Sequence, residues 1–287
     1  MSHAFLWCIT FAVCLTSSLP AQDDWIFLSN NEIKVGIKKT AGGAIGWLSE
    51  ANSDRNLINH HDQGRLIQQS YYGHQDGSMW ADKPWRWNPV QGGGYQGQQA
   101  KILELQADDD SLFVKTLPKH WASGVDLPEV IFEQTITLAG PVVKIQYHMV
   151  YTGTVKHPVH DQEIPAVFLD RSLSTLVFYD GNEPFMSAPL RRIEPGFPNE
   201  RYRCSEHWVA YVEDGDNGVG VAVPQADEFT CYRFGAADSP GACSYFAPLV
   251  RFAIEPEFEF EYVCFVTIGP LEQIRDRFVR LQSDDED

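Results

Sequence analysis

Apolar and polar residues alternate with a period of two along much of this chain, and this alternation constrains its fold more than any other feature. The clearest case is the segment EPEFEFEYVCFVTIG, residues 255–269. One face of the extended segment carries Phe258, Phe260, Tyr262, Cys264, Val266 and Ile268. The other face begins with glutamates and continues with Val263 and Phe265. Because neighbouring side chains point to opposite faces of a strand, the pattern predicts one long strand whose end is buried on both faces.

Glycine, proline and aspartate residues divide the rest of the chain into short strands. Residues 129–153 predict two strands that turn at Ala139-Gly140-Pro141, and residues 31–50 predict a pair that turns at Gly42-Gly43. Residues 206–224 predict a third pair that turns between Asp214 and Gly218. Strands at this spacing, joined by such turns, predict an all-β antiparallel sandwich.

One helix is predicted, in the segment PLEQIRDRFVRLQ near the C-terminus. Leu271, Ile274, Phe278 and Leu281 recur at helical spacing after Pro270. We expect this short helix to pack on the edge of the sandwich. The chain shows no internal repeat, no low-complexity linker and no shift in composition, so residues 22–287 are predicted to form a single domain.

The first 21 residues differ in character from the rest. An apolar run, AFLWCITFAVCL, is followed by TSSLPA and then by Gln22 and two aspartates. This pattern predicts a secretory signal peptide over residues 1–21, cleaved near Ala21, and therefore a secreted or periplasmic protein. A membrane span needs about 20 apolar residues, so neither this run nor any later segment is predicted to cross a membrane.

Charge and missing motifs exclude several classes of function. The formal net charge of -17 repels nucleic acids and anionic lipid surfaces, so neither is an expected partner. No G-x-S-x-G, P-loop, G-x-G-x-x-G or EF-hand pattern stands in a suitable context. No cofactor and no metal are therefore predicted.

Four cysteines follow the predicted signal peptide: Cys204, Cys231, Cys243 and Cys264. An exported chain meets an oxidising compartment, so we expect one disulfide among them, with the pairing left open. Cys264 lies in a strongly apolar strand and is equally suited to be a buried free thiol.

Aromatic rings and planar polar groups are concentrated in GRLIQQSYYG, residues 64–73, and WADKPWRWNPVQGGG, residues 80–94. Aromatic rings stack on the apolar face of a sugar, while arginine, asparagine and glutamine bind its hydroxyl groups. On a regular strand, however, Arg65, Gln69 and Tyr71 share one face, and Gln68 and Tyr72 share the other with Ser70. All of them can contact one ligand only if a bulge intervenes; otherwise the tryptophans cover the core and the glutamines bind backbone groups.

A second polar cluster stands in KHPVHDQEIPA, residues 156–166. His157, His160, Asp161, Gln162 and Glu163 lie within seven residues. A histidine beside a carboxylate is a usable acid–base unit near neutral pH. The His-x-x-His spacing with Glu163 would also suit a metal, and a solvated polar loop is the remaining alternative.

Residues 30–68, from NNEIKVGIKK to HHDQGRLIQ, resemble the start of galactose-mutarotase-like proteins, which include the aldose 1-epimerases. The matching positions are Gly42-Gly43, Asn56-Leu57 and Gly64-Arg65, and the resemblance implies that the arginine faces a sugar. The segment VYTGTVKHPVHDQ is similar to the place where epimerases carry a catalytic histidine, which implies a role for His157 or His160. The implied fold is an antiparallel β-supersandwich with a short C-terminal helix.

The chain also departs from the epimerase pattern. Gln68-Gln69 stand where epimerases carry an asparagine–arginine pair, and Val159-His160 follow His157-Pro158 in place of a Tyr-Phe-Asn string. The catalytic glutamate of the family has three candidates here, Glu228, Glu255 and Glu257. The resemblance therefore indicates the fold and a carbohydrate ligand, and it leaves the reaction open.

Together these features give a hypothesis for the site of an exported protein that binds oligo- or polysaccharide. Catalysis is assigned to His160, His74 and Tyr72. Saccharide binding is assigned to Arg65, Gln69, Trp87, Asn88, Gln91, His157 and Glu163. The function predicted is that of a polysaccharide lyase or hydrolase, and the alternatives are a non-catalytic carbohydrate-binding module and an aldose epimerase.

Overall fold

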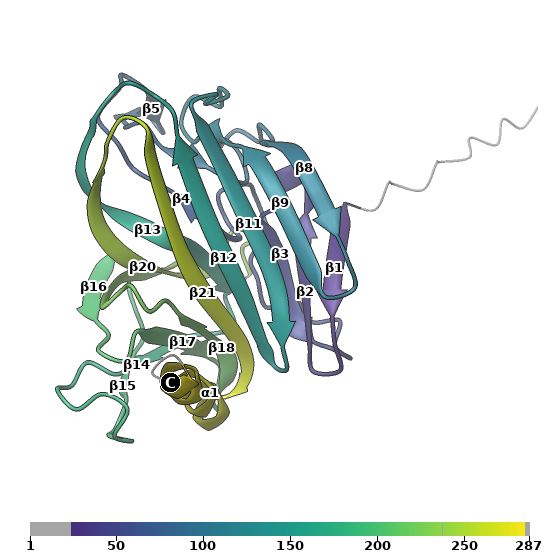
Figure 1. Ribbon diagram of the computed structural model, residues 1–287. Helices are drawn as coiled ribbons and strands as arrows, with labels where there is room; N and C mark the ends of the chain where they lie inside the picture. Colours follow the sequence, from purple (N-terminus) through teal and green to yellow (C-terminus); the bar gives the residue numbers. More distant parts are fainter. Residues whose placement is uncertain (1–23, 237, 285–287) are drawn as a thin grey trace, which may run out of the picture.

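Two β-sheets packed face to face form the body of the protein (Figure 1). The computed structural model describes residues 24–236 and 238–284, so the predicted signal peptide lies outside the described residues. Within the described part, the strands form sheets of ten and nine strands and a separate two-stranded hairpin. The predicted all-β, antiparallel supersandwich with one C-terminal helix is confirmed.

The ten-stranded sheet has the order β1-β2-β3-β4-β13-β20-β19-β16, and β7 and β10 are attached beside β4. Its strands are β1 (Trp25–Ser29), β2 (Ile33–Lys38), β3 (Ile45–Glu50), β4 (Ile67–Ser70), β7 (Pro89–Val90), β10 (Lys119–His120), β13 (His157–Asp170), β16 (Glu200–Arg203), β19 (Glu228–Phe234) and β20 (Cys243–Ile254).

The nine-stranded sheet has the order β15-β14-β17-β18-β21-β12-β11-β9-β8. Its strands are β8 (Lys101–Ala107), β9 (Ser111–Leu117), β11 (Val130–Ala139), β12 (Val142–Tyr151), β14 (Thr175–Phe178), β15 (Arg191–Ile193), β17 (Trp208–Val212), β18 (Asn217–Ala222) and β21 (Phe258–Pro270). The remaining elements are the hairpin strands β5 (Met79–Trp80) and β6 (Lys83–Pro84), the short 3-10 helix η1 (Lys39–Ala41) and helix α1 (Leu271–Asp284).

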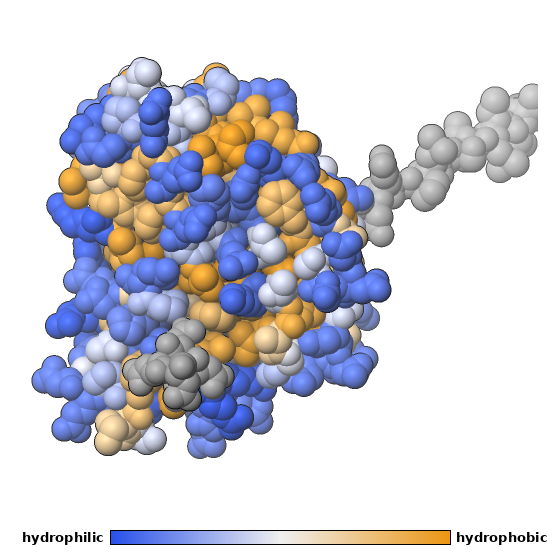
Figure 2. Space-filling view, viewed as in Figure 1, coloured by the Kyte–Doolittle hydropathy of each residue, from blue (hydrophilic) through white to orange (hydrophobic). Residues whose placement is uncertain are grey.

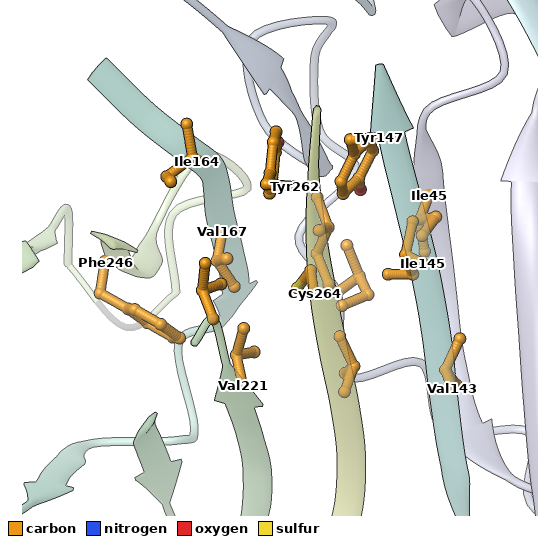
Figure 3. Packing of buried hydrophobic residues seen from close by; sticks show 14 of the residues in the cluster. Ile45, Val143, Ile145, Tyr147, Ile164, Val167, Val221, Phe246, Tyr262 and Cys264 are labelled. Carbon is orange, nitrogen blue, oxygen red and sulfur yellow. The ribbon is translucent and has the colours of Figure 1, made fainter. Parts of the chain in front are cut away.

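The core lies between the two sheets and follows from the alternation in the sequence. On β21, Tyr262, Cys264 and Val266 are buried and point toward the ten-stranded sheet. Figure 3 shows Tyr262 beside Tyr147 of β12, with ring centroids 5.0 Å apart. Burying such large apolar side chains stabilises the fold by roughly 1.5–3 kcal/mol each, before the entropy of ordering them is counted.

The three predicted hairpins are present. Ala139 pairs with Val142 at the β11–β12 turn, and Val212 pairs with Gly218 at the β17–β18 turn. Between β2 and β3 the chain passes through η1 and then two glycines. Both Gly42 (φ 57°) and Gly43 (φ 72°) adopt left-handed backbone, which glycine enters without steric cost.

Helix α1 forms as predicted, but it packs on a sheet face and not on the edge of the sandwich. Ile274 and Phe278 pack against Trp208 on the outer side of β17 and β18. Gly220 of β18 provides the room, because a Cβ atom there would lie 2.3 Å from Ile274. Arg275 also binds Glu206, with Nη2 and Oε1 2.5 Å apart, and this buried pair fixes the helix to the sheet.

The rest of the outer face of the nine-stranded sheet is mixed in character, and Figure 2 shows hydrophilic side chains interspersed with hydrophobic ones on this side of the molecule. At its centre Lys115 lies 2.8 Å from Glu133, which also contacts His148. Glu259 lies 3.4 Å from His148 on the other side of its ring. Such exposed ion pairs keep the face solvated and contribute little to stability.

The expected disulfide is wrong. Cys204, Cys231, Cys243 and Cys264 are free, buried thiols. Cys231 and Cys243 lie on the neighbouring strands β19 and β20, but Cys231 pairs with Phe246 and Cys243 pairs with Phe234, so they are not opposite each other. Their sulfur atoms serve as apolar packing groups, and burial raises the pKa of each thiol. In the described part of the chain, none of the helices is both long and apolar enough to traverse a lipid bilayer.

Candidate functional site

A pocket of about 390 Å³ opens on the outer face of the ten-stranded sheet. Four neighbouring strands, β4, β13, β20 and β19, form its floor. The floor side chains belong to positions that alternate with the core positions of the same strands: Gln68, Ser70, Glu163, Ala166, Phe168, Tyr232 and Tyr245. The walls come from loops and from the short strands β5 and β7, and they carry Tyr72, Trp80, Trp85, Asn88, Val90, Trp121, Phe197 and Asn199.

The backbone at Leu66 explains how Arg65 joins this pocket. Leu66 has φ 81°, a left-handed conformation that is rare for a branched residue. This one residue shifts the alternation, so that Arg65 lies on the same face as Gln68 and Tyr72. Leu66 therefore brings Arg65 to the pocket, whereas Gln69 and Tyr71 stay on the inner face. The preceding Gly64 lies under Trp121, where a Cβ atom would come within 2.1 Å of the indole ring.

Arg65 is held in place by several contacts. Its Nη2 donates to the carbonyl oxygen of Gly241 at 3.1 Å, and Nη1 lies 3.7 Å from Asp62. The guanidinium lies over the ring of Phe168, 5.4 Å from its centroid. Its Nε is buried and has no hydrogen-bond partner within the described part of the chain, which leaves a donor of this cation unused.

Glu163 is the carboxylate among the described residues that line the pocket. Tyr245 donates a hydrogen bond of 2.6 Å to its Oε1. Burial raises the pKa of Glu163 above its usual range, and the hydrogen bonds from Tyr245 and Tyr72 oppose this shift. A carboxyl group with a raised pKa, inside a cavity, is suited to proton transfer near neutral pH.

Tyr72 was predicted to be catalytic, and the structure places it on the pocket wall. Burial raises the pKa of Tyr72 well above the usual value, and the charge of Glu163 acts in the same direction. Its phenolate is therefore hard to form, so Tyr72 is suited to donate a hydrogen bond and not to act as a base. Its backbone is fixed by Gln162, whose side-chain amide binds the backbone nitrogen and oxygen of Tyr72.

Asn88 lines the pocket as well, but its polar atoms already have partners. Its Nδ2 donates to the carbonyl oxygen of Tyr71 at 2.8 Å, and its Oδ1 accepts from the indole nitrogen of Trp85 at 3.2 Å. Asn88 therefore positions Trp85. Gln68 is likewise occupied, because its Oε1 accepts from the backbone of Gly92 at 2.6 Å.

Three of the predicted site residues form a separate, inward cluster. Trp87 stacks on His157 with ring centroids 3.9 Å apart, and His74 lies on the far side of His157 with the two Nδ1 atoms 2.9 Å apart. The other nitrogen of His157 lies 3.1 Å from the hydroxyl of Tyr151. Gly73 makes this packing possible, because a Cβ atom there would lie 2.3 Å from His157. None of the three lines the pocket.

Burial determines the charge state of this inward cluster. His157 is 1% exposed, and desolvation lowers its pKa from 6.5 to about 4, helped by the nearby His74. His157 is therefore neutral at pH 7. It fills space between rings and bridges two polar neighbours, which corrects the expectation that it contacts a sugar.

The prediction that Gln69 and Gln91 hold a sugar is also corrected, because both point between the sheets. Gln69 donates to the carbonyl oxygen of Glu133 at 3.0 Å and accepts from the hydroxyl of Tyr71. Gln91 lies 3.4 Å from Gln134, whose amide in turn donates to Gly43. These buried amides link the ten-stranded sheet to β11 of the other sheet, and each needs its partners because an unpaired buried amide is costly.

His160, the main catalytic candidate from sequence, lies beside the pocket and not in it. Arg86 lies 3.3 Å from its Nδ1, and the same guanidinium lies 5.9 Å from the ring centroid of Tyr72. Burial and the charge of Arg86 lower the pKa of His160. The glutamates that the resemblance left open, Glu228, Glu255 and Glu257, do not line the pocket either. No group of three metal-ligating side chains was found among the described residues.

The aromatic floor, and Trp121 and Phe197 of the walls, were not predicted from the sequence. Phe168, Tyr232 and Tyr245 come from three different strands, and Phe197 comes from a loop. One sequence feature does indicate the pocket floor: on the outer face of β20, Tyr245 stands between the small residues Cys243 and Ala247. Small residues on both sides of a tyrosine leave room for a ligand, but only the strand order shows that Phe168 and Tyr232 lie next to it.

Several solved structures have a similar architecture. A galactose mutarotase-like protein from Lactobacillus casei superposes with a TM-score of 0.57 at 9% identity, over 85% of this chain and 99% of that one. A galactose mutarotase related enzyme from Lactobacillus acidophilus gives 0.58 at 13% identity, over 85% and 97%. The 4-alpha-glucanotransferase from Thermococcus litoralis gives 0.50 at 15% identity, over 85% of this chain and 37% of that one. No protein-family profile and no curated protein matches the sequence.

Proposed function

The chain has the fold of galactose mutarotase-like proteins, and from this premise we propose that it binds a saccharide in the outer pocket and that Glu163 transfers a proton to or from it. The observation that carries the proposal is the cavity itself. It combines aromatic walls with a half-buried carboxyl group, Glu163, and a cation, Arg65. Aromatic rings beside a few fixed polar groups are the usual chemistry of sugar recognition.

The roles of the pocket residues follow from their contacts. Trp85, Trp121 and Trp80 offer ring faces for the apolar side of a sugar. Tyr245 and Tyr72 keep their protons, so they donate hydrogen bonds to Glu163 or to a bound hydroxyl group. Glu163, with its raised pKa, exchanges its proton more readily near neutral pH than an exposed glutamate would. Export of the protein, expected from residues 1–21, would direct this chemistry to extracellular or periplasmic glycans.

The residues that line the pocket give less support to hydrolysis by a pair of carboxylates. Glycosidases place a pair of acidic residues about 5–10 Å apart around the bond that they cleave. Apart from Glu163, the described residues that line the pocket include no acidic residue and no histidine. Proton transfer by Glu163 with help from tyrosine hydroxyls fits an epimerase-type or lyase-type reaction better.

A second candidate, a lyase for uronic-acid units, is favoured by Arg65. A lyase removes the proton next to a carboxylate, and a cation that binds this carboxylate makes the proton easier to remove. Arg65 would bind this carboxylate, and Glu163 would take the proton from the adjacent carbon. The bond from the next carbon to the glycosidic oxygen breaks as the C=C bond forms, and Tyr72 or Tyr245 gives a proton to the leaving oxygen. Release of an unsaturated product, followed by its ultraviolet absorbance with alginate, pectate and hyaluronate, distinguishes this reaction from epimerisation.

The test separates binding from chemistry. Titration calorimetry against a panel of neutral and acidic mono- and oligosaccharides should find a ligand, and Trp85→Ala should weaken its affinity about tenfold or more. Glu163→Gln should keep the affinity within about threefold and lose turnover. If Glu163→Gln keeps full turnover, its role in proton transfer is refuted; if wild type binds the ligand without changing it, the protein is a non-catalytic binding module.

A further inference from the structure

Two phenylalanine rings lie exposed at the rim of the pocket. Phe197 is 63% exposed and Phe234 is 44% exposed, and their centroids are 5.4 Å apart. Large apolar side chains that are exposed in pairs beside a cavity often mark a binding surface. The main core does not account for either ring, because neither belongs to the cluster between the sheets.

These two rings continue a row that starts on the floor of the pocket. Tyr245 and Tyr232 have centroids 4.4 Å apart, and Tyr232 lies 5.5 Å from Phe197. On β19, Tyr232 and Phe234 stand two residues apart and share the outer face, while Cys231, the residue before Tyr232, points into the core. Because a strand rises about 3.3 Å per residue, Tyr232 and Phe234 are spaced roughly 6.6 Å apart along β19.

The loop that carries Phe197 is anchored to the same strand. The backbone nitrogen of Arg233 donates to the carbonyl oxygen of Gly196 at 3.0 Å. The backbone nitrogen of Gly196 donates to Glu200 at 2.6 Å, and Asn199 donates to Thr230 at 3.0 Å. An exposed ring that is held by its backbone on both sides is pre-organised, so little entropy is lost when a ligand stacks on it.

We propose that this row, Tyr245–Tyr232–Phe197–Phe234, is an outer subsite for further sugar units, so that the ligand is an oligosaccharide or one end of a polysaccharide. This inference rests on the proposed function, because the first sugar unit occupies the pocket. The pocket admits one end of the glycan, and the exposed rings stack on the units that protrude from it. A glycan fits this surface better than a protein partner, because a narrow row of rings is smaller than the ~800 Å² per partner of a stable protein interface.

Binding measured as a function of chain length tests the inference. Cello-, xylo-, manno- and galacto-oligosaccharides of one to four units would be titrated into wild type by calorimetry. In the series that binds, we expect affinity to rise about tenfold between one unit and three. Phe234→Ala and Phe197→Ala should each remove most of this gain. Phe27→Ala is the matched control, because Phe27 is 38% exposed on β1, outside the strands that form the pocket, and it should leave the gain intact.

The possible failures are distinguishable. If a monosaccharide binds and affinity does not rise with length, or if it rises equally in Phe234→Ala, the outer subsite is refuted and the proposed function stands. If none of the sugars binds at any length, the proposed function itself fails. If wild type shows no gain with length and instead forms dimers that Phe234→Ala abolishes, the exposed rings form a self-association surface, which also overturns the subsite.

Discussion

The outer pocket and the inward histidine cluster are built from the same kinds of residues and from neighbouring segments of chain, yet only one of them forms a pocket. The pocket holds Tyr72, Trp85 and Glu163 on an outer sheet face. The cluster of His74, Trp87 and His157 lies at the end of β13, and His157 is 1% exposed. Residue type alone therefore does not distinguish a binding site from packed core.

Backbone geometry makes the difference. The left-handed Leu66 brings Arg65 to the outer face, and the register of β13 shifts between His157 and His160 and again between Glu163 and Val167. Each shift changes which side of the sheet the next side chain faces. The following four predictions test the contrast between the two regions, from the largest expected effect to the smallest.

Replacing a tryptophan should affect stability in one region and binding in the other. Trp87→Ala leaves a cavity in the buried cluster and should reduce the free energy of unfolding by about 3–5 kcal/mol. Trp85→Ala, on the partly exposed pocket wall, should cost about 1.5 kcal/mol or less and should mainly weaken sugar binding. Urea denaturation measures both variants. Equal losses of stability would show that the pocket wall is core.

Acid should destabilise the protein through the inward cluster. The folded-state pKa of His157 is about 4 and its usual value is 6.5, so the unfolded chain binds the proton more tightly. Stability is therefore complete above pH 6.5 and falls as the pH drops toward 4, by up to about 3 kcal/mol. His160, whose pKa is also lowered, adds a contribution of the same sign.

Denaturation curves between pH 7 and pH 4 test this, with His157→Gln as the matched variant. The variant should be less stable at pH 7 and should lose less stability on acidification. An unchanged slope in His157→Gln would show that His157 is protonated in the folded state and that the cluster is more open than its burial indicates.

Removing the pocket cation should weaken binding and change stability little. Arg65→Met keeps the apolar stem that packs near Phe168 and removes the guanidinium. Affinity for the sugar ligand should fall about tenfold, or ~1.4 kcal/mol. Arg55→Met is the control, because Arg55 binds Glu213 in an exposed ion pair and does not line the pocket. Equal affinity in wild type and Arg65→Met would remove Arg65 from the site.

Reducing agent should change the stability of the protein least of all, because neither region contains a disulfide. Cys243 packs beside Tyr245 and Phe168 of the pocket floor, Cys264 lies in the core between the sheets, and both are free thiols. The melting temperature with and without dithiothreitol should agree. Loss of a native disulfide costs about 2–5 kcal/mol, so a clear decrease on reduction would reveal a bond between two of the four cysteines.

The fold was predictable from the sequence because alternation and turn residues act locally. The β11–β12 hairpin and the faces of β21 follow directly from residue order. The pocket was predictable only in part: Arg65, Tyr72, Asn88 and Glu163 do line it. The place of Arg65 among them depends on Leu66, whose left-handed backbone nothing in its side chain indicates, because leucine rarely adopts it.

The remaining site residues could not be found without the strand order. Tyr232 and Tyr245 are brought to Glu163 by the neighbouring positions of β19, β20 and β13. Conversely, Gln69 and Gln91 had the composition of a sugar site, but their partners, Glu133 and Gln134, belong to the other sheet. Contacts between segments far apart in the chain determine both which residues line the pocket and which glutamines are buried. No local pattern in the sequence shows these contacts.

The position of β21 has a consequence for how the protein is made. β21 pairs with β12 on one side and with β18 on the other, and all the other strands precede it in the chain. Until it has been synthesised, the nine-stranded sheet remains two separate blocks, β15-β14-β17-β18 and β12-β11-β9-β8. A growing chain therefore holds two unpaired apolar edges, and we expect it to need a chaperone until this one segment joins them.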